Sequence, residues 1–274
     1  MSRVQFYESS LVLLLPGGAR SARWLFLKWD SVLRMSACHG SAWLVILPGR
    51  HCLGEVIPNA SNPSKENIMA FQYKRLDKNN AAVLLVDHQT GLLSLVRDIE
   101  PDRFKNNVLA LSDLAKYFKL PTILTTSFEN GPNGPLVPEL KEQFPDAPYI
   151  ARPGNINAWD NEDFVKAVKA TGKKQLIIAG VVTEVCVAFP ALSALEEGFD
   201  VFVVTDASGT FNELTRDSAW RRMEAAGAQL MTWFGVACEL HRDWRNDIEG
   251  LGTLFSNHIP DYRNLMTSFS KLSK

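Results

Sequence analysis

The sequence lacks the features that would direct a protein to a membrane or to nucleic acid. No apolar run in its 274 residues approaches the roughly 18 to 20 residues that a membrane-spanning helix requires. The best candidate for a signal peptide, LVLLLPGG, is interrupted by proline after only a few residues, so export is not expected. Lys and Arg total 29 against 30 for Asp and Glu, and this balance provides no basic field for nucleic acid or an anionic membrane. We therefore expect neither nucleic acid nor a membrane as a partner.

Cysteine is scarce, and the motifs of several enzyme classes are absent. Cys38, Cys52, Cys186 and Cys238 form no CxxC pair and have no histidine at a zinc-ligand spacing. A disulfide framework and a structural metal site are therefore not indicated, and we expect a reducing, cytoplasmic setting. No GxGxxG follows the first expected strand and no GxSxG occurs, so dinucleotide binding and a serine hydrolase lack their main signals. In LLVDHQTG, Gln89 stands where a haloacid dehalogenase-like phosphatase needs its second Asp.

The chain divides into two unequal parts near Met69. Residues 1–68 mix Trp, Cys, Gly and Pro without a sustained helical or alternating period, whereas later segments show regular apolar patterns. Lys65 and Glu66 can be encoded by a purine run that resembles a bacterial ribosome-binding site just upstream of Met69. We therefore expect Met69 to be the true start and residues 1–68 to be a translated leader. The alternative is a real but irregular N-terminal extension.

Residues 69–274 alternate strands and helices in the manner of a parallel sheet. AAVLLVD, for example, is a continuous apolar run, as expected of a strand that helices cover on both faces. The expected strands are 81–87, 121–127, 174–180, 200–207 and 228–233, and the expected helices are 103–120, 162–172, 183–198 and 215–227. This alternation predicts an α/β doubly wound, mostly parallel sheet with right-handed crossovers.

The C-terminal segment 239–269 is rich in Trp, Leu, Phe and Tyr although it lies beyond the last expected strand. Such a segment needs a surface that covers its apolar side chains. It either packs back on its own domain or docks on a neighbouring subunit. We favour the second and expect a C-terminal oligomerisation tail.

Three polar residues are expected at the carboxyl ends of strands or in the loops that follow them, where open parallel sheets bind ligands. Asp87 ends LLVD, Arg152 lies in YIARPGN, and Cys186 lies one turn into the expected helix after LIIAG. Thr183 is a suitable N-cap, so Cys186 would lie among free N–H groups. The helix dipole and a nearby cation would favour the thiolate, and the same N–H groups could bind an oxyanion. The alternative is a buried structural cysteine.

Asp87 and Arg152 each have a structural alternative. A carboxylate at the end of an apolar strand must find donors, face a cleft or have a raised pKa, but Asp87 could also cap the turn HQTG. Arg152 cannot transfer a proton at neutral pH, although it can hold Asp87 in place and favour the thiolate. Most single arginines instead form surface salt bridges.

Separated motifs in this sequence resemble those of the isochorismatase-like cysteine hydrolases. The motifs are LLVDHQ, a basic residue before NINAWD, and GVVTEVC, in that order. Members of that family carry an Asp, Lys and Cys triad on a three-layer αβα fold. The segments RPGNINAWDNEDFVKAVKATGKKQLIIAGVVTEVCVAF, VVTDASGTFNE and MTWFGVACELHRDWRNDIEGL are more closely similar to its YcaC hydrolase subgroup. The resemblance extends from about Met69 to the C-terminus and implies a hydrolase domain over residues 69–274.

The resemblance implies a role for each candidate residue. Asp87 would be the base, Cys186 the nucleophile, and Arg152 would take the place of the family's lysine. That lysine typically stands in a Lys-x-x-x-Ser-Ala-Phe-like motif, which RPGNINAW replaces here. The resemblance also implies a cis Val181–Val182 peptide bond, an oxyanion hole formed by the N–H groups of Val182 and Cys186, and a homo-oligomer such as an octamer.

The nicotinamidase branch of the family adds an Asp/His metal site, for which this sequence has no match. His88 adjoins Asp87, but strand alternation would point it elsewhere, and TTSFENGPNGP contains no histidine. We therefore expect no metal and no cofactor, and we interpret His88 as a turn or interface residue.

The sequence thus predicts a hydrolase with a small-molecule substrate. The Cys186 thiolate would attack an amide or related carbonyl, the N–H groups of Val182 and Cys186 would hold the tetrahedral intermediate, and water would hydrolyse the thioester. Phe128, Asn157 and Trp159 are expected walls of the substrate pocket because of their positions in the chain. The alternative is a hydrolase-like fold that has lost turnover and serves in binding or assembly.

Overall fold

The computed structural model describes residues 5–7, 10–14, 24–28 and 73–272, and it separates two compact units, Met1–Ile68 and Met69–Lys274. In the first unit, β1 (Gln5–Tyr7), β2 (Ser10–Leu14) and β3 (Trp24–Lys28) form an antiparallel sheet. The sequence pattern predicted no regular element in this part of the chain. These strands nevertheless consist largely of apolar and aromatic residues, which favour strands. The expected start at Met69 lies outside the described residues and remains a proposal.

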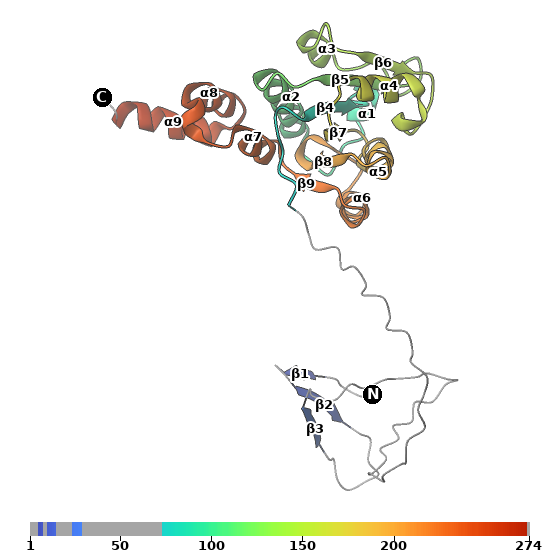
Figure 1. The fold of residues 1–274 in the computed structure, drawn as a ribbon, viewed down its shortest axis with the longest axis vertical. Helices are drawn as coiled ribbons and strands as arrows, with labels where there is room; N and C mark the ends of the chain where they lie inside the picture. The colour runs from blue at the N-terminus through green and yellow to red at the C-terminus, as the bar shows by residue number, and fades with distance from the viewer. Residues whose placement is uncertain (1–4, 8–9, 15–23, 29–72, 273–274) are drawn as a thin grey trace, which may run out of the picture. The chain divides into compact units, whose positions relative to one another are not determined.

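Six strands form one parallel sheet in the second unit (Figure 1). They are β4 (Ala81–Val86), β5 (Thr122–Ser127), β6 (Tyr149–Arg152), β7 (Gln175–Gly180), β8 (Asp200–Val204) and β9 (Gln229–Met231). Their order is β6-β5-β4-β7-β8-β9, and every neighbouring pair is parallel. The predicted α/β doubly wound fold is confirmed, and the sheet is entirely parallel. The order reverses between β4 and β7, which creates a topological switch point.

Helices cover both faces of the sheet. They are α1 (Thr90–Leu93), α2 (Pro101–Tyr117), α3 (Pro138–Gln143), α4 (Glu162–Ala170), α5 (Ala188–Glu196), α6 (Glu213–Ala225), α7 (Trp233–His241), α8 (Ile248–His258) and α9 (Pro260–Leu272). Short 3-10 helices are η1 (Ala158–Asp160), η3 (Thr205–Ala207) and η4 (Trp244–Asn246), and η2 (Thr183–Val187) is π-helical. None of the helices in the described part of the chain combines the length and apolarity that crossing a membrane would need.

Alternate residues of each central strand enter two different cores. Val83 and Leu85 of β4 pack with residues of α2, α7 and α8, whereas Leu84 and Val86 pack with residues of α4, α5 and α6. This division follows from the two-residue period of a strand. It explains why β4 is a continuous apolar run, and it confirms the predicted three-layer αβα arrangement.

The C-terminal segment only partly follows the expectation that it docks on a neighbour. Helices α7 and α8 contact α2 of the same domain, and aromatic rings from α7, η4 and α9 cluster around Phe255 of α8. The domain itself thus covers these side chains, and docking of the tail on a neighbouring subunit stays a prediction. No residue of α9 is buried, and Leu265 and Leu272 are 59% and 87% exposed. Figure 1 shows α8 and α9 projecting beyond α7, away from the sheet.

Candidate active site

The predicted site residues come from segments that meet at the switch point of the sheet. Val86 of β4 pairs with Gly180 of β7, so these two strands end at the same level. Asp87 follows β4, Cys186 lies in the turn after β7, and Arg152 is the last residue of β6. The carboxyl ends of the strands therefore bring together three residues that are far apart in the sequence.

Asp87 and Arg152 form a fully buried ion pair. Arg152 Nη2 donates to Asp87 Oδ1, and neither side chain is exposed. Arg152 Nε donates to Thr125 Oγ1 at 3.0 Å, and Nη1 donates to the carbonyl oxygens of Asn155 and Ile156. Because a guanidinium presents its donors in a rigid fork, these partners fix its orientation. The structure thus excludes the alternative of a surface salt bridge at Arg152.

The Asp87 carboxylate is directed into the site and not to the turn that follows it. Asp87 has a φ of 56°, in the left-handed region that Asp enters more readily than most residues. Helix α1 begins after Gln89, whose side chain makes no capping bond. Asp87 Oδ2 is buried and accepts no hydrogen bond from a nitrogen or oxygen donor of the described residues. One carboxylate oxygen therefore binds Arg152, and the other can accept a proton.

Cys186 lies in a π-helical turn and not in the first turn of a regular α-helix. The turn η2 precedes α5, and the Val187 N–H donates to the carbonyl of Val182 at 3.3 Å. The N-cap is Val182, and the Thr183 hydroxyl is buried with no hydrogen-bond partner in the described part of the chain. The prediction of Thr183 as N-cap is therefore wrong. Single π-helical turns of this kind are frequent at functional sites.

The surroundings of Cys186 oppose the thiolate that the sequence led us to expect. Cys186 is only 9% exposed. Burial, followed by the charge of Asp87, raises the pKa of the thiol above its usual range, and these effects outweigh the Val182 N–H and Arg152, which lower it. The loss of water around the Cys186 sulfur thus raises its pKa more than the backbone N–H groups of the turn, on which the sequence prediction relied, lower it.

Asp87 and Cys186 form a coupled pair. Burial raises the pKa of Asp87, while Arg152 and a hydrogen bond with Cys186 lower it. A thiol that donates to Asp87 favours the ionised carboxylate, whereas an ionised Asp87 disfavours a thiolate. The charge of Asp87 therefore opposes ionisation of Cys186, while Arg152 favours the ionised form of both groups.

The peptide segment before Cys186 has the geometry that the motifs implied. The Val181–Val182 peptide bond is cis, as predicted. The Val182 N–H forms a hydrogen bond with Cys186 that lowers the pKa of the thiol. A backbone donor therefore lies directly against the sulfur atom.

His88 is a core residue, so its interpretation as a turn or interface residue is wrong. Its side chain is completely buried, and Nε2 lies 3.2 Å from the carbonyl oxygen of Ala207. Its ring stacks with Phe104 at a centroid distance of 6.4 Å. Burial lowers the pKa of His88 to about 4. No group of three or more His, Cys, Asp or Glu side chains within the described ranges is arranged to hold a metal ion.

The three expected pocket residues have different surroundings. Phe128 follows β5, has a φ of 51° and is 53% exposed, and its N–H donates to the carbonyl of Arg152 at 3.0 Å. Asn157 caps η1 and donates to Ser193 Oγ at 3.1 Å. Trp159 Nε1 donates to Glu197 at 2.8 Å. Phe128 is thus tied to the ion pair through Arg152, whereas the described contacts of Asn157 and Trp159 join η1 to α5 and its C-terminal end.

Two residues that support the site were missed by the sequence analysis. Thr125 accepts from Arg152 Nε and donates to the carbonyl of Ile150 at 2.8 Å. Gln89 bonds to both the N–H and the carbonyl of Ser127, at 2.9 and 3.0 Å, and so joins the ends of β4 and β5. The only signal for either residue was a polar side chain in or directly after an apolar strand.

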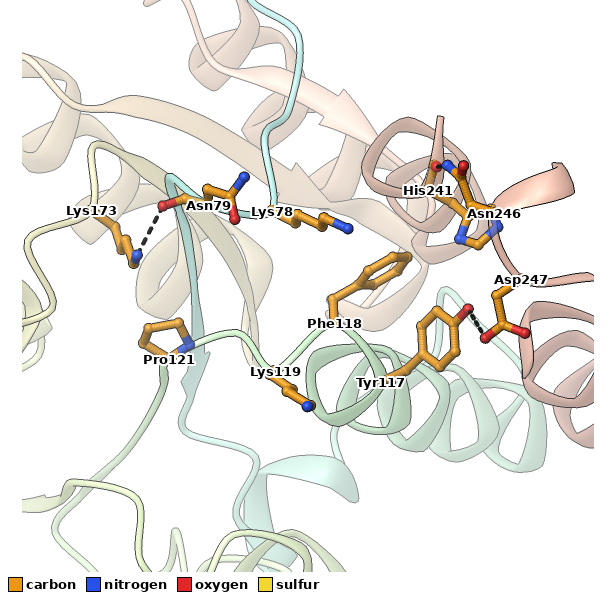
Figure 2. Close-up of a pocket in the computed structure, with 10 residues that line it drawn as sticks. All are labelled: Lys78, Asn79, Tyr117, Phe118, Lys119, Pro121, Lys173, His241, Asn246 and Asp247. Carbon is orange, nitrogen blue, oxygen red and sulfur yellow. Dashed lines mark hydrogen bonds between the residues drawn. The ribbon is translucent and has the colours of Figure 1, made fainter. Parts of the chain in front are cut away.

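A separate hollow of about 810 Å³ lies at the amino ends of the strands, opposite the carboxyl ends that carry the candidate site. It is lined by residues that precede β4, β5 and β7 and by the end of α2 and the segment around α7 and η4 (Figure 2): Lys78, Asn79, Tyr117, Phe118, Lys119, Pro121, Lys173, His241, Asn246 and Asp247. Its hydrogen bonds include Tyr117 to Asp247 at 2.7 Å and Lys173 to the Asn79 carbonyl at 2.8 Å. Asp87, Arg152 and Cys186 do not line it, so the candidate chemistry is located elsewhere.

The family is shown by a match to the isochorismatase domain model over residues 81–234, which contain all three residues of the site. The chain belongs to the isochorismatase family. This finding confirms the family, and with it the class of hydrolases, that the motifs indicated. Among curated proteins, the chain is similar to "Probable hydrolase YcaC" of Escherichia coli strain K12, with 88% identity over 206 residues, 75% of this chain and 99% of that protein. It is 26% identical to isochorismatase domain-containing protein 2 of Danio rerio, over 72% of this chain and 98% of that protein.

Two solved structures of family members are similar to this chain. One is E. coli YcaC, described as an octameric hydrolase of unknown specificity, with 89% identity, a TM-score of 0.73, and coverage of 74% of this chain and 99% of that one. The other is Pseudomonas aeruginosa YcaC with hexane-2,5-diol and covalent acrylamide, with 80% identity, a TM-score of 0.73, and coverage of 73% and 100%.

Proposed function

We propose that this family member is a cysteine hydrolase that cleaves a small amide or a related carbonyl compound through a covalent thioester. One observation carries the proposal: Cys186 adjoins a carboxylate that a fully buried arginine holds in place. A buried ion pair contributes little net stability compared with apolar residues of similar volume. Its position beside a sulfur atom at the switch point therefore supports a chemical role.

In the proposed reaction, Asp87 removes the thiol proton as the sulfur attacks. Asp87 Oδ2, which has no nitrogen or oxygen donor within the described residues, takes the proton of Cys186, and the new S–C bond produces a tetrahedral oxyanion. The N–H groups of Val182 and Cys186 stabilise this oxyanion, and donors in such positions contribute a large share of catalysis. The protonated Asp87 then gives its proton to the leaving amine as the C–N bond breaks.

Hydrolysis of the thioester repeats the same proton transfers with water. Asp87 removes a proton from water, the resulting hydroxide attacks the thioester carbon, and the acid leaves as the sulfur regains its proton. Arg152 acts throughout as a fixed positive charge and exchanges no proton, because its guanidinium stays protonated at neutral pH. The raised pKa of Cys186 fits this order of events, in which deprotonation accompanies attack and does not precede it.

The decisive experiment compares Cys186→Ala with the unchanged chain on a panel of small amides, ureas and hydroxamates. We expect hydrolysis by the unchanged chain, an acyl adduct on Cys186 by mass spectrometry, and loss of both in the variant. Hydrolysis that persists in Cys186→Ala would refute the proposal. Cys238→Ala is the matched control, because Cys238 is also a free cysteine of the described residues and lies on α7.

A catalytically weak assembly protein is the second candidate. The low exposure and raised pKa of Cys186 favour it, as does arginine in the place of the family's lysine. Iodoacetamide distinguishes the two candidates. Fast labelling of Cys186 that Asp87→Ala slows supports the hydrolase, whereas equally slow labelling of Cys186 and Cys238 supports the assembly protein.

We also propose that the chain forms a homo-oligomer through α9 and works in a reducing compartment such as the cytoplasm. The exposed Leu265 and Leu272 of α9 support self-association, as does the similarity to the octameric YcaC of E. coli. The free thiols of Cys186 and Cys238 support the reducing compartment.

A further inference from the structure

The loop after β8 lies alongside the turn that carries Cys186. Val181 forms a parallel bridge with Gly209. The Thr183 N–H donates to the Gly209 carbonyl at 3.1 Å, and the Gly209 N–H donates to the Gly180 carbonyl at 3.3 Å. These bonds attach the loop to the backbone on both sides of the Val181–Val182 peptide, so the position of the nucleophile turn depends on the position of this loop.

Close packing leaves room only for glycine at position 209. A Cβ atom there would lie 2.6 Å from a methyl group of Val96 and 3.2 Å from the ring of Phe104. Real Cβ atoms essentially never approach other atoms as closely as the first of these contacts. Because Gly209 has no side chain, the loop backbone can lie between Val96 and Phe104 on one side and η2 on the other.

Thr210, the next residue, uses all of its polar groups to join three segments. It is completely buried. Its hydroxyl donates to Glu184 Oε2 at 2.6 Å, and its N–H donates to Asp98 Oδ1 at 2.7 Å. Its carbonyl accepts from the N–H groups of Arg97 and Asp98 at 2.8 and 3.3 Å. Thr210 thus connects the segment after α1, the loop after β8 and η2.

Glu184 is the residue through which this network reaches the nucleophile. It lies in η2, two positions before Cys186. The turn has no side-chain N-cap, and the Thr183 hydroxyl has no hydrogen-bond partner among the described residues. The bond from Thr210 to Glu184 is therefore a side-chain attachment for a turn that lacks the usual one.

We propose that Thr210 is a positioning residue, and that its hydroxyl, through Glu184, fixes η2 so that Cys186 Sγ faces Asp87 and the Val182 N–H. This inference rests on the proposed function, because it concerns the reactivity of the same sulfur atom. Thr210 touches neither Cys186 nor Asp87 in any described hydrogen bond, and it acts only through the turn. Correct placement matters because a displacement of about 1 Å can reduce a reaction rate about 100-fold.

The test measures alkylation of Cys186 in the full-length chain by iodoacetamide, followed by peptide mass spectrometry. In this step the thiol proton passes to Asp87, the S–C bond forms at the methylene carbon, and iodide leaves. Thr210→Val keeps the volume and removes the hydroxyl, and we expect it to slow labelling by about 10- to 100-fold. Thr210→Ser keeps the hydroxyl and should label at nearly the rate of the unchanged chain. Cys238 in the same sample is the internal reference and should be unaffected.

The matched control is Thr122→Val. This change also removes a buried threonine hydroxyl, which donates to the Leu120 carbonyl at 3.1 Å. Thr122 is the first residue of β5 and therefore lies at the end of the sheet opposite the candidate site. A general loss of stability would affect both variants, whereas loss of positioning affects only Thr210→Val. Glu184→Leu should slow labelling as Thr210→Val does, and the double variant should be no slower than either one, because both remove the same bond.

Hydrogen exchange of the amides of residues 181–187 provides a second measurement that does not depend on reactivity. We expect faster exchange in Thr210→Val and unchanged exchange in Thr122→Val. Unchanged exchange in Thr210→Val, or equal slowing of labelling by Thr210→Val and Thr210→Ser, overturns the positioning role. Turnover that persists in Cys186→Ala overturns the proposed hydrolase instead, and the exchange comparison still decides the role of Thr210.

Discussion

Arg152 Nε donates to Thr125 Oγ1 at 3.0 Å, and Nη2 of the same guanidinium donates to Asp87 Oδ1. The Thr125 hydroxyl is itself held in place, because it donates to the Ile150 carbonyl. Arginine at this position is therefore held by partners that a lysine ammonium could not satisfy together, because an ammonium is a compact charge without a planar fork. The surrounding strands thus provide partners that suit arginine at position 152.

We accordingly predict that Arg152→Lys lowers both stability and the labelling rate of Cys186, and that Arg152→Met lowers stability more. Removing one partner of a buried ion pair costs about 3 to 5 kcal/mol, because Asp87 would be left as an unpaired buried charge or would become protonated. Urea unfolding measures this loss. Arg245→Met is the control, because Arg245 is 86% exposed in its ion pair with Asp243 and such pairs contribute at most about 1 kcal/mol. Equal effects at both positions would contradict the buried pair.

His88 should make the domain sensitive to acid. Because burial lowers its pKa from 6.5 to about 4, the unfolded chain binds a proton at a higher pH than the folded chain does. The resulting stabilisation is complete above pH 6.5 and is lost as the pH falls through 4. At 1.36 kcal/mol per pKa unit, it amounts to about 3 kcal/mol. Asp206, whose pKa is raised to about 6 by burial, acts in the opposite sense, so the total slope of stability with pH is smaller.

The variant His88→Gln isolates this contribution. Its amide nitrogen can still donate to the Ala207 carbonyl, but it does not titrate. We expect the stability of the unchanged chain minus that of His88→Gln to decrease as the pH is lowered from 7 to 4, measured by urea unfolding at each pH. A difference that stays constant over this range would show that His88 is not protonated during acid unfolding.

Sequence reasoning located the strands and the candidate site because both depend on local patterns. β4 and β7 are continuous apolar runs, and Asp87 and the turn containing Cys186 follow them directly. β6 was missed as a strand because its apolar run, residues 149–151, is very short, and in the structure only Arg152 of this strand is buried. The positions of polar side chains in the core could not be read in the same way, since the burial of His88 and Thr210 depends on segments distant in the sequence.

The ionisation of Cys186 shows a further limit of sequence reasoning. The free N–H groups and the cation that favour a thiolate could be inferred from the motif. The burial of the thiol could not, and burial is the largest influence on its pKa. The π-helical turn likewise forms hydrogen bonds with Gly209 and Thr210, which lie after β8 and far from it in the sequence.

Residues 1–68 should be dispensable for the site. Asp87, Arg152, Cys186 and both hydrophobic cores lie within the described residues 73–272. We predict that a chain starting at Met69 keeps the melting temperature and the Cys186 labelling rate of the full-length chain. We also propose that the natively expressed protein starts at Met69, which intact mass spectrometry measures. A native protein that begins at Met1 would refute the leader, and slower labelling of the shorter chain would show that the N-terminal residues support the site.

Assembly should depend on one face of α9. Leu265 and Leu272 are seven residues, or about two helical turns, apart, so they lie on the same side of α9. Both are exposed. We predict that Leu265→Asp combined with Leu272→Asp reduces the molar mass measured by size-exclusion chromatography with light scattering, because charges would replace apolar contacts between copies. Thr267→Asp is the control, since a spacing of two residues from Leu265 places it on the opposite side of the helix. If the Leu variant keeps the mass of the unchanged chain, α9 is not the interface. If Thr267→Asp reduces the mass equally, added charge and not the apolar face is responsible.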